Sequence, residues 1–269
     1  MLQFSISIIL IVSVLVVQRQ IDYIQSKNLG FNKDNIVSFS REGRLEQQSE
    51  LFLAAARNLP GVIKASSMGG NMVGGHSSAG AFDWPGKQPV QKINFGIFYV
   101  NYDLIELLGI DLSQGRMLSA QFGSDSTASI VFNQAAIDAM GLKDPVGKTI
   151  QFFGDSRQIV GVTKNFHFES LYEEVKPVCF VYRTKWADQM LVKIAAGRER
   201  ETLSQLEDLY KQYNEGLPFE YKFLDEDFQR LYAAENRVAV GTTGTIANQN
   251  VHRYLPPDHY SQISDWFSR

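Results

Sequence analysis

The chain has 269 residues, of which 44% are hydrophobic and 20% are charged, with 26 Lys and Arg against 29 Asp and Glu. This length suits one large domain or two small ones with a substantial core, and the apolar content excludes a disordered or low-complexity chain. Because basic residues are not in excess, nothing favours binding to nucleic acid. The single cysteine, Cys179, excludes an internal disulfide framework and a Cys-rich zinc site.

The first predicted element is a membrane anchor. Residues 1–17 contain no charged side chain, and as a helix they would extend for about 25 Å, slightly short of the usual hydrocarbon core of about 30 Å. A signal peptide needs a basic start and a small-residue cleavage motif, which are missing, and a buried core helix would have to hide apolar groups on every face. We therefore expect a transmembrane helix over 1–18 and a stalk over 19–34. The flanking charges do not define its orientation.

Two segments, one near each end of the chain, have the pattern of a β-α-β unit. In each, a strand-forming run leads into an amphipathic helical repeat and then into a second strand-forming run. The expected strands and helices cover 35–40, 52–59, 62–67, 190–195, 198–213 and 219–223. Such a pair predicts a split β-α-β, ferredoxin-like lobe made of residues 35–79 and 186–240, and hence an α+β fold.

The segment between these units, residues 80–185, is richer in strands and is expected to be an inserted lobe. Its predicted strands cover 93–100, 129–132, 149–153, 157–162 and 178–182. Two short helices interrupt them. Asn101 is expected to cap the first, which ends at Gly109, and Asn133 to cap the second, which ends at Gly141.

The last part of the chain changes in character. Residues 225–240 have the apolar repeat of another helix, with Phe228 and Leu231 on its apolar side. Residues 241–269 have no apolar run and no clear strand. They are expected to be an atypical, disordered or appended tail.

One glycine-rich stretch is similar to a phosphate-binding loop. Residues 141–149 place Gly141, Gly147 and Lys148 before Thr149, but five residues separate the glycines where the motif needs four. A phosphate loop also follows a strand and opens a helix, whereas here a helix comes before and a strand after. A helix C-cap followed by a turn is the simpler interpretation.

A second stretch is similar to the nucleophile elbow of hydrolases. Residues 75–79 place Ser77 between Gly75 and Ala79, but the motif has a second glycine at the position of Ala79. The motif also requires a buried strand immediately before it. Residues 68–75 instead form a glycine-rich loop. A tethered hydrolase that uses Ser77 stays open as a minor hypothesis.

The remaining polar residues have structural interpretations. His167, between two aromatic residues, is expected to be a packed side chain, and the acidic run at 225–227 is explained by helix capping and the helix dipole. His252, Asp258 and His259 lie where nothing rigid would hold a metal ion. The sequence therefore predicts no catalytic residue, no cofactor and no metal site.

Four segments in order carry a resemblance to a known family. They are 99–116, with an aspartate, a short helix and Gly115-Arg116, then 130–136, 144–148 and 159–168. Over residues 1–240 the chain resembles an ABC transporter permease of the FtsX/MacB type with a MacB-like extracytoplasmic domain.

This resemblance implies an inner-membrane protein whose first span starts in the cytoplasm and whose bulk lies outside, in the periplasm. It also implies a cytoplasmic ABC ATPase subunit and a second permease copy as partners, with a periplasmic adaptor or lipoprotein as a further one. Such permeases do not hydrolyse ATP themselves. Their membrane helices transmit ATPase-driven movement to the outer domain, which acts in export, efflux or extraction of a substrate.

The family continues after residue 240 into further membrane spans, and here the chain is polar. We therefore expect a truncated permease fragment. An independent membrane-tethered binding or sensor module, with no role in transport, is the alternative.

Overall fold

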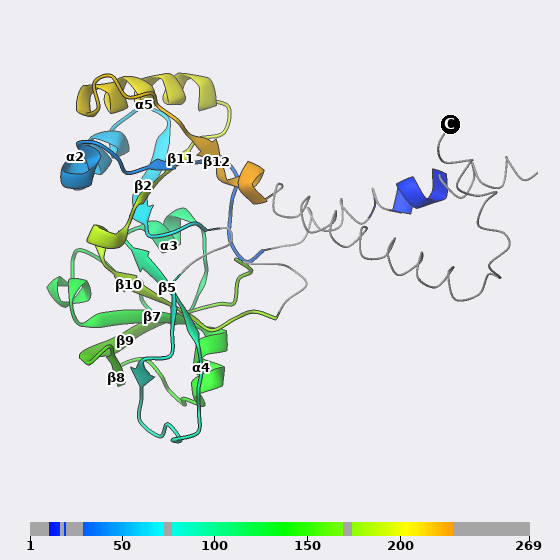
Figure 1. Ribbon diagram of the computed structural model, residues 1–269, viewed down its shortest axis with the longest axis vertical. Helices are drawn as coiled ribbons and strands as arrows, with labels where there is room; N and C mark the ends of the chain where they lie inside the picture. The colour runs from blue at the N-terminus through cyan, green and yellow to red at the C-terminus, as the bar shows by residue number, and fades with distance from the viewer. Residues whose placement is uncertain (1–10, 17–18, 20–28, 73–76, 169–173, 229–269) are drawn as a thin grey trace, which may run out of the picture. The chain divides into compact units, whose positions relative to one another are not determined.

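The computed structural model describes residues 11–16, 19, 29–72, 77–168 and 174–228 (Figure 1). Most of the predicted anchor over 1–18, the first part of the predicted stalk, the helix beyond residue 228 and the tail over 241–269 lie outside the described residues. Residues 11–16 are helical, and all six side chains are exposed. Among the residues that the structure describes, no helix combines the length and apolar character required to cross a membrane.

In the described part of the chain, the strands form one 12-stranded sheet. One end of this sheet has the order β12-β1-β11-β2, in which β1 and β2 each pair antiparallel with β11 and therefore run parallel to each other. Strand β12 pairs antiparallel with the other side of β1. Two β-α-β connections are thus interleaved, as the sequence pattern predicted. The elements of this split β-α-β unit are β1 (Ile36–Ser40), α2 (Leu45–Arg57), β2 (Val62–Met68), β11 (Gln189–Ile194), α5 (Glu199–Tyr213) and β12 (Lys222–Phe223).

Helices α2 and α5 lie side by side on one face of these strands (Figure 1). Side chains alternate between the two faces of a strand, so Val37 and Phe39 of β1 point toward the helices while Ser38 and Ser40 point to the other face. Phe52 of α2 and Leu206 of α5 are fully buried in the resulting core. On the opposite face of β1, the polar side chains of Ser38 and Ser40 follow Ile36, which is fully buried.

The rest of the sheet comes from the segment between β2 and β11. It continues in the order β5-β10-β7-β9-β8-β4, with β3 paired to β5 and β6 paired to β9. Two pairs are parallel, β5 with β10 and β7 with β9. Its strands are β3 (Ser77–Ala79), β4 (Phe82–Asp83), β5 (Phe95–Val100), β6 (Leu112–Gly115), β7 (Ser129–Asn133), β8 (Thr149–Phe152), β9 (Asp155–Thr163) and β10 (Val178–Tyr182).

This central segment has its own core. Helix α4 (Gln134–Met140) packs Ala136, Ile137 and Met140 against one face of the strands. The same core contains Phe95 and Ile97 of β5, because these side chains share that face. Shorter helical turns are α3 (Leu104–Leu107), η1 (Gly123–Ser126) and η2 (Thr184–Trp186). The lobe boundaries predicted at residues 79/80 and 185/186 stay a prediction.

The two predicted Asn caps have different outcomes. The Oδ1 atom of Asn133 accepts a hydrogen bond from the Ala136 N–H at 2.9 Å, and α4 ends at Gly141 with φ of 66°. The cap predicted at Asn101 is wrong, since α3 begins only at Leu104 after Asp103 with φ of 66°. The Asn101 side chain instead donates to Glu50 and accepts from the Tyr102 N–H.

Candidate functional site

The two ends of the described domain meet each other. The incoming segment, residues 29–32, buries Leu29 and Phe31, and the outgoing helical turn, residues 224–228, buries Leu224 and Phe228. The rings of Phe31 and Phe228 have centroids 5.2 Å apart with an interplanar angle of 50°. Both ends are therefore held in one apolar contact.

This contact is part of a larger aromatic cluster, which we term the aromatic junction. Phe166 lies edge-on to Phe31 at 6.4 Å and leads on to the rings of β5 and β10. Phe98 and Phe180 on those strands are stacked at 5.5 Å and point to the face opposite the α4 core. The six rings of the aromatic junction are Phe31, Phe98, Phe166, Phe168, Phe180 and Phe228.

The backbone of residues 165–168 fixes the incoming segment against the junction. The His167 N–H donates to the Leu29 carbonyl at 2.7 Å. Gly30, with φ of +80°, crosses this segment so closely that a Cβ atom would lie 2.6 Å from the Asn165 carbonyl oxygen. Asn165 is itself fixed, because its Oδ1 accepts from the Ala135 N–H of α4 at 2.8 Å. The segment that contains His167 therefore holds the incoming chain in a fixed position.

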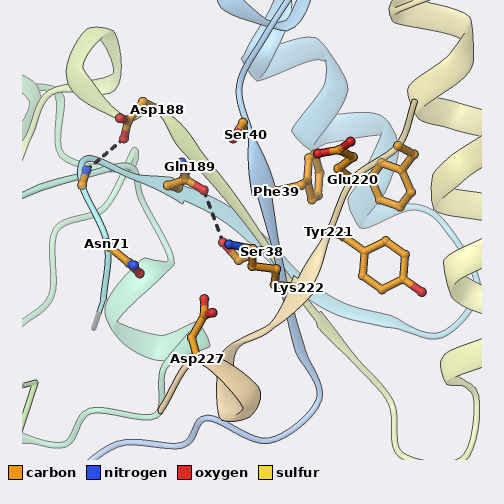
Figure 2. Close-up of a pocket in the computed structure, with 12 residues that line it drawn as sticks. Ser38, Phe39, Ser40, Asn71, Asp188, Gln189, Glu220, Tyr221, Lys222 and Asp227 are labelled. Atoms are coloured by element: carbon orange, nitrogen blue, oxygen red, sulfur yellow. Dashed lines mark hydrogen bonds between the residues drawn. The ribbon is translucent and has the colours of Figure 1, made fainter. Parts of the chain in front are cut away.

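A groove with a volume of about 770 Å³ lies beside the junction, on the polar face of β1 (Figure 2). Its floor includes Ser38 and Gln189, whose side chains hydrogen-bond at 3.4 Å. At one end, Asp188 Oδ1 accepts from the Gly70 N–H at 2.9 Å. The lining residues are Ser38, Phe39, Ser40, Gly70, Asn71, Asp188, Gln189, Phe219, Glu220, Tyr221, Lys222 and Asp227.

Charge in the groove is unbalanced. Among the described residues that line it, three carry carboxylates, Asp188, Glu220 and Asp227, and one carries an ammonium group, Lys222. Figure 2 shows the Asp227 side chain pointing toward the side of the groove that holds Ser38 and Lys222, while the Tyr221 ring points away from them. The groove therefore favours a polar, positively charged occupant over an apolar one.

The stretch similar to a phosphate loop is a helix C-cap followed by a turn. Gly141 ends α4, residues 145–148 turn, and β8 follows. The Gly147 N–H donates to the Ile159 carbonyl at 2.8 Å, so this amide is used within the protein. The Lys148 side chain donates to the Lys143 carbonyl. The helix-then-strand context expected from the sequence is confirmed.

Ser77, the candidate nucleophile of the hydrolase hypothesis, is an exposed residue of β3 that pairs with Ile97. Gly75 and His76, beside it in the motif, lie outside the described residues. A triad would also need a histidine: His252 and His259 lie outside the described residues, and the His167 backbone N–H bonds to Leu29 in the segment that holds the incoming chain. Ser77 on an edge strand differs from the strand-to-helix turn that an elbow requires.

Arg116 of the Gly115-Arg116 motif forms an ion pair with a buried carboxylate, which the sequence did not indicate. Arg116 donates to both carboxylate oxygens of Asp125, at 2.5 and 2.8 Å, and the Asp125 side chain is fully buried. Burial raises the pKa of Asp125, but hydrogen bonds from Arg116, Ser129 and the Ser119 N–H outweigh it and hold that pKa below its ordinary value. These bonds fix the η1 turn to β7, so the motif has a structural role.

Among the residues described, no group of three or more His, Cys, Asp and Glu side chains is arranged to hold a metal ion. Cys179 is fully buried, and burial raises the pKa of its thiol. A buried neutral thiol is a poor nucleophile.

Comparison with known proteins identifies one matching family and several solved structures that are similar to this chain. The family described as the MacB-like periplasmic core domain matches residues 4–208. The periplasmic region of MacB from Actinobacillus actinomycetemcomitans is similar with a TM-score of 0.53 and 16% identity, covering 77% of this chain and 97% of that one. The extracellular domain of the noncanonic ABC-type transporter YknZ from Gram-positive bacteria has a TM-score of 0.48 and 14% identity, covering 70% and 97%. Among curated proteins, no sequence matches. At such identities the likeness to MacB shows a shared α+β fold.

Proposed function

The chain belongs to the MacB-like periplasmic core domain family, and from this premise we propose that it is the extracytoplasmic domain and membrane anchor of an ABC transporter permease subunit. Its bulk then lies outside the inner membrane. A cytoplasmic ABC ATPase, a second permease copy and a periplasmic adaptor or lipoprotein are its proposed partners. The chain is then a fragment of that permease, in which residues 35–79 with 186–240 form one lobe and residues 80–185 form the other.

The observation that carries this proposal is the contact between Phe31 and Phe228. In such a permease, the chain before residue 29 and the chain after residue 228 both lead toward the membrane. Their movements reach the domain at the same place, the aromatic junction. A rigid, close-packed cluster transmits displacement because its packing cannot deform continuously.

The route from the junction into the domain follows two elements. Phe98 of β5 and Phe180 of β10 connect the cluster to the central strands, whereas Phe31 leads within five residues into β1 of the split unit. A displacement of the outgoing turn at Phe228 is thus delivered to both parts of the sheet. This is how the geometry would couple membrane helices to an outer domain.

The helical residues 11–16 support the anchor. Five of their six side chains are large and apolar, and these are between 48% and 62% exposed. Because such a surface is costly in water, we propose that it lies in the hydrocarbon core. The double variant Val12→Arg/Leu15→Arg should move the full chain from carbonate-washed membranes into the soluble fraction, since each Arg costs about 2.5–3.5 kcal/mol in a membrane helix. The matched control Val12→Leu/Leu15→Val should stay in the membrane.

The extracytoplasmic location is testable with a thiol reagent that does not cross membranes. The one native cysteine is buried, so the wild-type chain should not react in its folded form. Val90→Cys places a thiol where the side chain is 83% exposed, and it should be labelled in intact spheroplasts. Labelling only after permeabilisation would contradict the proposed location. Denatured wild-type chain, in which Cys179 becomes accessible, verifies that the reagent is active.

The role as a permease subunit needs a separate test. The tagged full chain should co-purify from membranes with an ABC ATPase, and Phe228→Ala should reduce any stimulation of ATP hydrolysis while leaving the complex intact. A chain that is extracytoplasmic and anchored but never associates with an ATPase would instead support the second candidate, an independent binding module. The groove on the polar face of β1 is the observation that favours this alternative.

A further inference from the structure

We propose that the groove beside β1 binds an extended, positively charged peptide segment of a partner protein, and that its occupancy is communicated to the aromatic junction. The binding step stands on the groove alone. The communication step rests on the proposed function. The groove volume, about 770 Å³, lies within the range of about 300–1,000 Å³ typical of ligand sites.

An unpaired strand edge provides the backbone contact for an extended ligand. The β1–β12 ladder pairs Val37 with Phe223 and Ser38 with Lys222, and it ends there. The Arg41 N–H donates to the Asp188 carbonyl, toward β11. Because successive residues of a strand present their backbone groups to opposite sides, Ser40 presents its N–H and C=O toward the open side, where the described ladder contains no partner for it. Addition of an extended segment to such an edge is a common mode of peptide recognition.

The charges around this edge select the kind of segment. Asp188, Glu220 and Asp227 outnumber Lys222 in the lining, so the described residues of the groove carry a net negative formal charge. Lys and Arg side chains of a bound segment would meet these carboxylates, whereas an acidic segment would be repelled. Aromatic rings line part of the groove, but the polar floor of Ser38 and Gln189 suits a backbone and its hydrogen bonds better than an apolar ligand.

The groove is built on the two elements that leave the junction. Its floor strand β1 follows Phe31 directly, and its opposite wall includes Asp227, the residue before Phe228. A ligand that contacts both Ser40 and Asp227 would therefore tie the incoming side of the domain to the outgoing side. Movement at the junction would change the spacing of these walls, and ligand binding would in turn favour one spacing.

Binding can be measured with the full chain in detergent and a fluorescent pentapeptide, Lys-Val-Lys-Val-Lys, by fluorescence anisotropy. We expect the wild-type chain to bind this probe and to bind Glu-Val-Glu-Val-Glu at least tenfold more weakly. Asp188→Asn and Asp227→Asn should each weaken binding about two- to fivefold, in proportion to a solvent-accessible charge pair. Lys222→Met, which removes the ammonium group among the described lining residues, should strengthen it.

Two further variants distinguish binding in the groove from a non-specific effect of the protein's net charge. Asp83→Asn removes an exposed carboxylate on β4, at the other end of the sheet order, and should leave the affinity unchanged. Ser40→Pro removes the N–H at the open edge without changing charge, and should weaken binding while the thermal unfolding midpoint stays within a few degrees. A probe with N-methylated backbone amides should bind the wild-type chain more weakly.

Several outcomes would overturn the proposal. These are equal affinity for the acidic and basic probes, equal weakening by Asp83→Asn and Asp227→Asn, and no detectable binding to the wild-type chain. If Asp227→Asn instead changes the sedimentation of the chain alone, a second copy occupies the groove and the peptide proposal is wrong. Because the probe assay requires neither an ATPase nor a membrane location, its failure is distinguishable from failure of the proposed function.

Discussion

Phe31 and Phe228, which lie at opposite ends of the described domain, contact each other with ring centroids 5.2 Å apart. Phe228 is 1% exposed and Phe31 is 8% exposed, so the contact is part of the interior. Segments far apart in the sequence are thereby joined at the point where the chain enters and leaves the domain.

Removal of either ring should destabilise the protein. Phe31→Ala and Phe228→Ala should each lower the free energy of unfolding by about 3–5 kcal/mol, as measured by urea denaturation of the full chain in detergent. The double variant should cost less than the sum of the two by about 0.5–1.5 kcal/mol, because the rings interact directly. Phe153→Ala, at a ring that is 58% exposed, is the matched control and should cost less than about 1 kcal/mol. Additive effects would contradict a direct contact.

The ion pair between Arg116 and Asp125 should make stability depend on pH. The pKa of Asp125 is held below its ordinary value of 3.8, so its contribution is present above that pH and is lost as the pH falls through the lower folded value. Asp125→Asn should cost about 3 kcal/mol at neutral pH and should flatten the stability profile below pH 3.8. Thermal unfolding between pH 2 and pH 7 measures both effects. Asp111→Asn, in an exposed pair with Lys164, should cost less than about 1 kcal/mol.

Asn133 should tolerate substitution poorly. Its Oδ1 accepts from the N–H groups of Ala136 and Val178, and its Nδ2 donates to the Lys176 carbonyl, all within 3.0 Å. Asn133→Ala removes a helix cap and leaves buried backbone groups without partners, so we expect a loss of about 2–4 kcal/mol. Asn133→Asp keeps the acceptor and should recover part of it. An alanine variant as stable as the wild-type chain would show that these bonds contribute little.

Gly161 should resist even the smallest side chain. A Cβ atom there would lie 2.1 Å from the Arg116 carbonyl oxygen, where β6 continues alongside β9. Gly161→Ala should therefore force β9 and the Arg116 backbone apart, and we expect a loss of more than about 2 kcal/mol in urea unfolding. Gly123→Ala is the control, since a Cβ atom there meets nothing within 4 Å. It should be neutral or stabilising by up to about 1 kcal/mol.

Long elements with strong periodicity were predictable from the sequence. The helical repeat around Phe52 and the run over 198–213 identified α2 and α5, because these helices bury one face and expose the other. A split β-α-β unit was also predicted from the paired β-α-β pattern, and the structure gives its strand order as β12-β1-β11-β2. Short strands such as β3, β4 and β6 were missed, since two to four residues carry no detectable alternation.

The wrong cap at Asn101 shows how tertiary contacts override a local signal. An Asn before an apolar run favours capping, yet its amide bonds to Glu50 of α2, which is distant in sequence. The predicted strand over 219–223 shortened to β12 for a similar reason, because residues 219–221 leave the β1 ladder and line the groove. The groove exists because these residues leave the ladder, and no residue pattern in the sequence predicts that they do.

The aromatic junction could not be predicted from the sequence, for a different reason. Phe166 and Phe168 stood out beside His167, and Phe228 was placed on the apolar side of a helix, but nothing in the sequence pairs Phe31 with Phe228. Such pairing depends on where the two ends of the domain lie in space. The family-like motif over 159–168 gains a physical reason here, since its last residues hold the incoming segment at Leu29 and Gly30.

The interleaved order of the strands has a consequence for synthesis. Strands β1 and β2 do not pair with each other, and the strand that joins them, β11, is made only after the whole central segment. The core of that segment draws its buried residues from 82 to 181 alone, so it can close while the first β-α-β connection still waits for its partner strand. The part of the domain first to leave the ribosome is then among the last to be completed, and its unpaired edges need protection until β11 arrives.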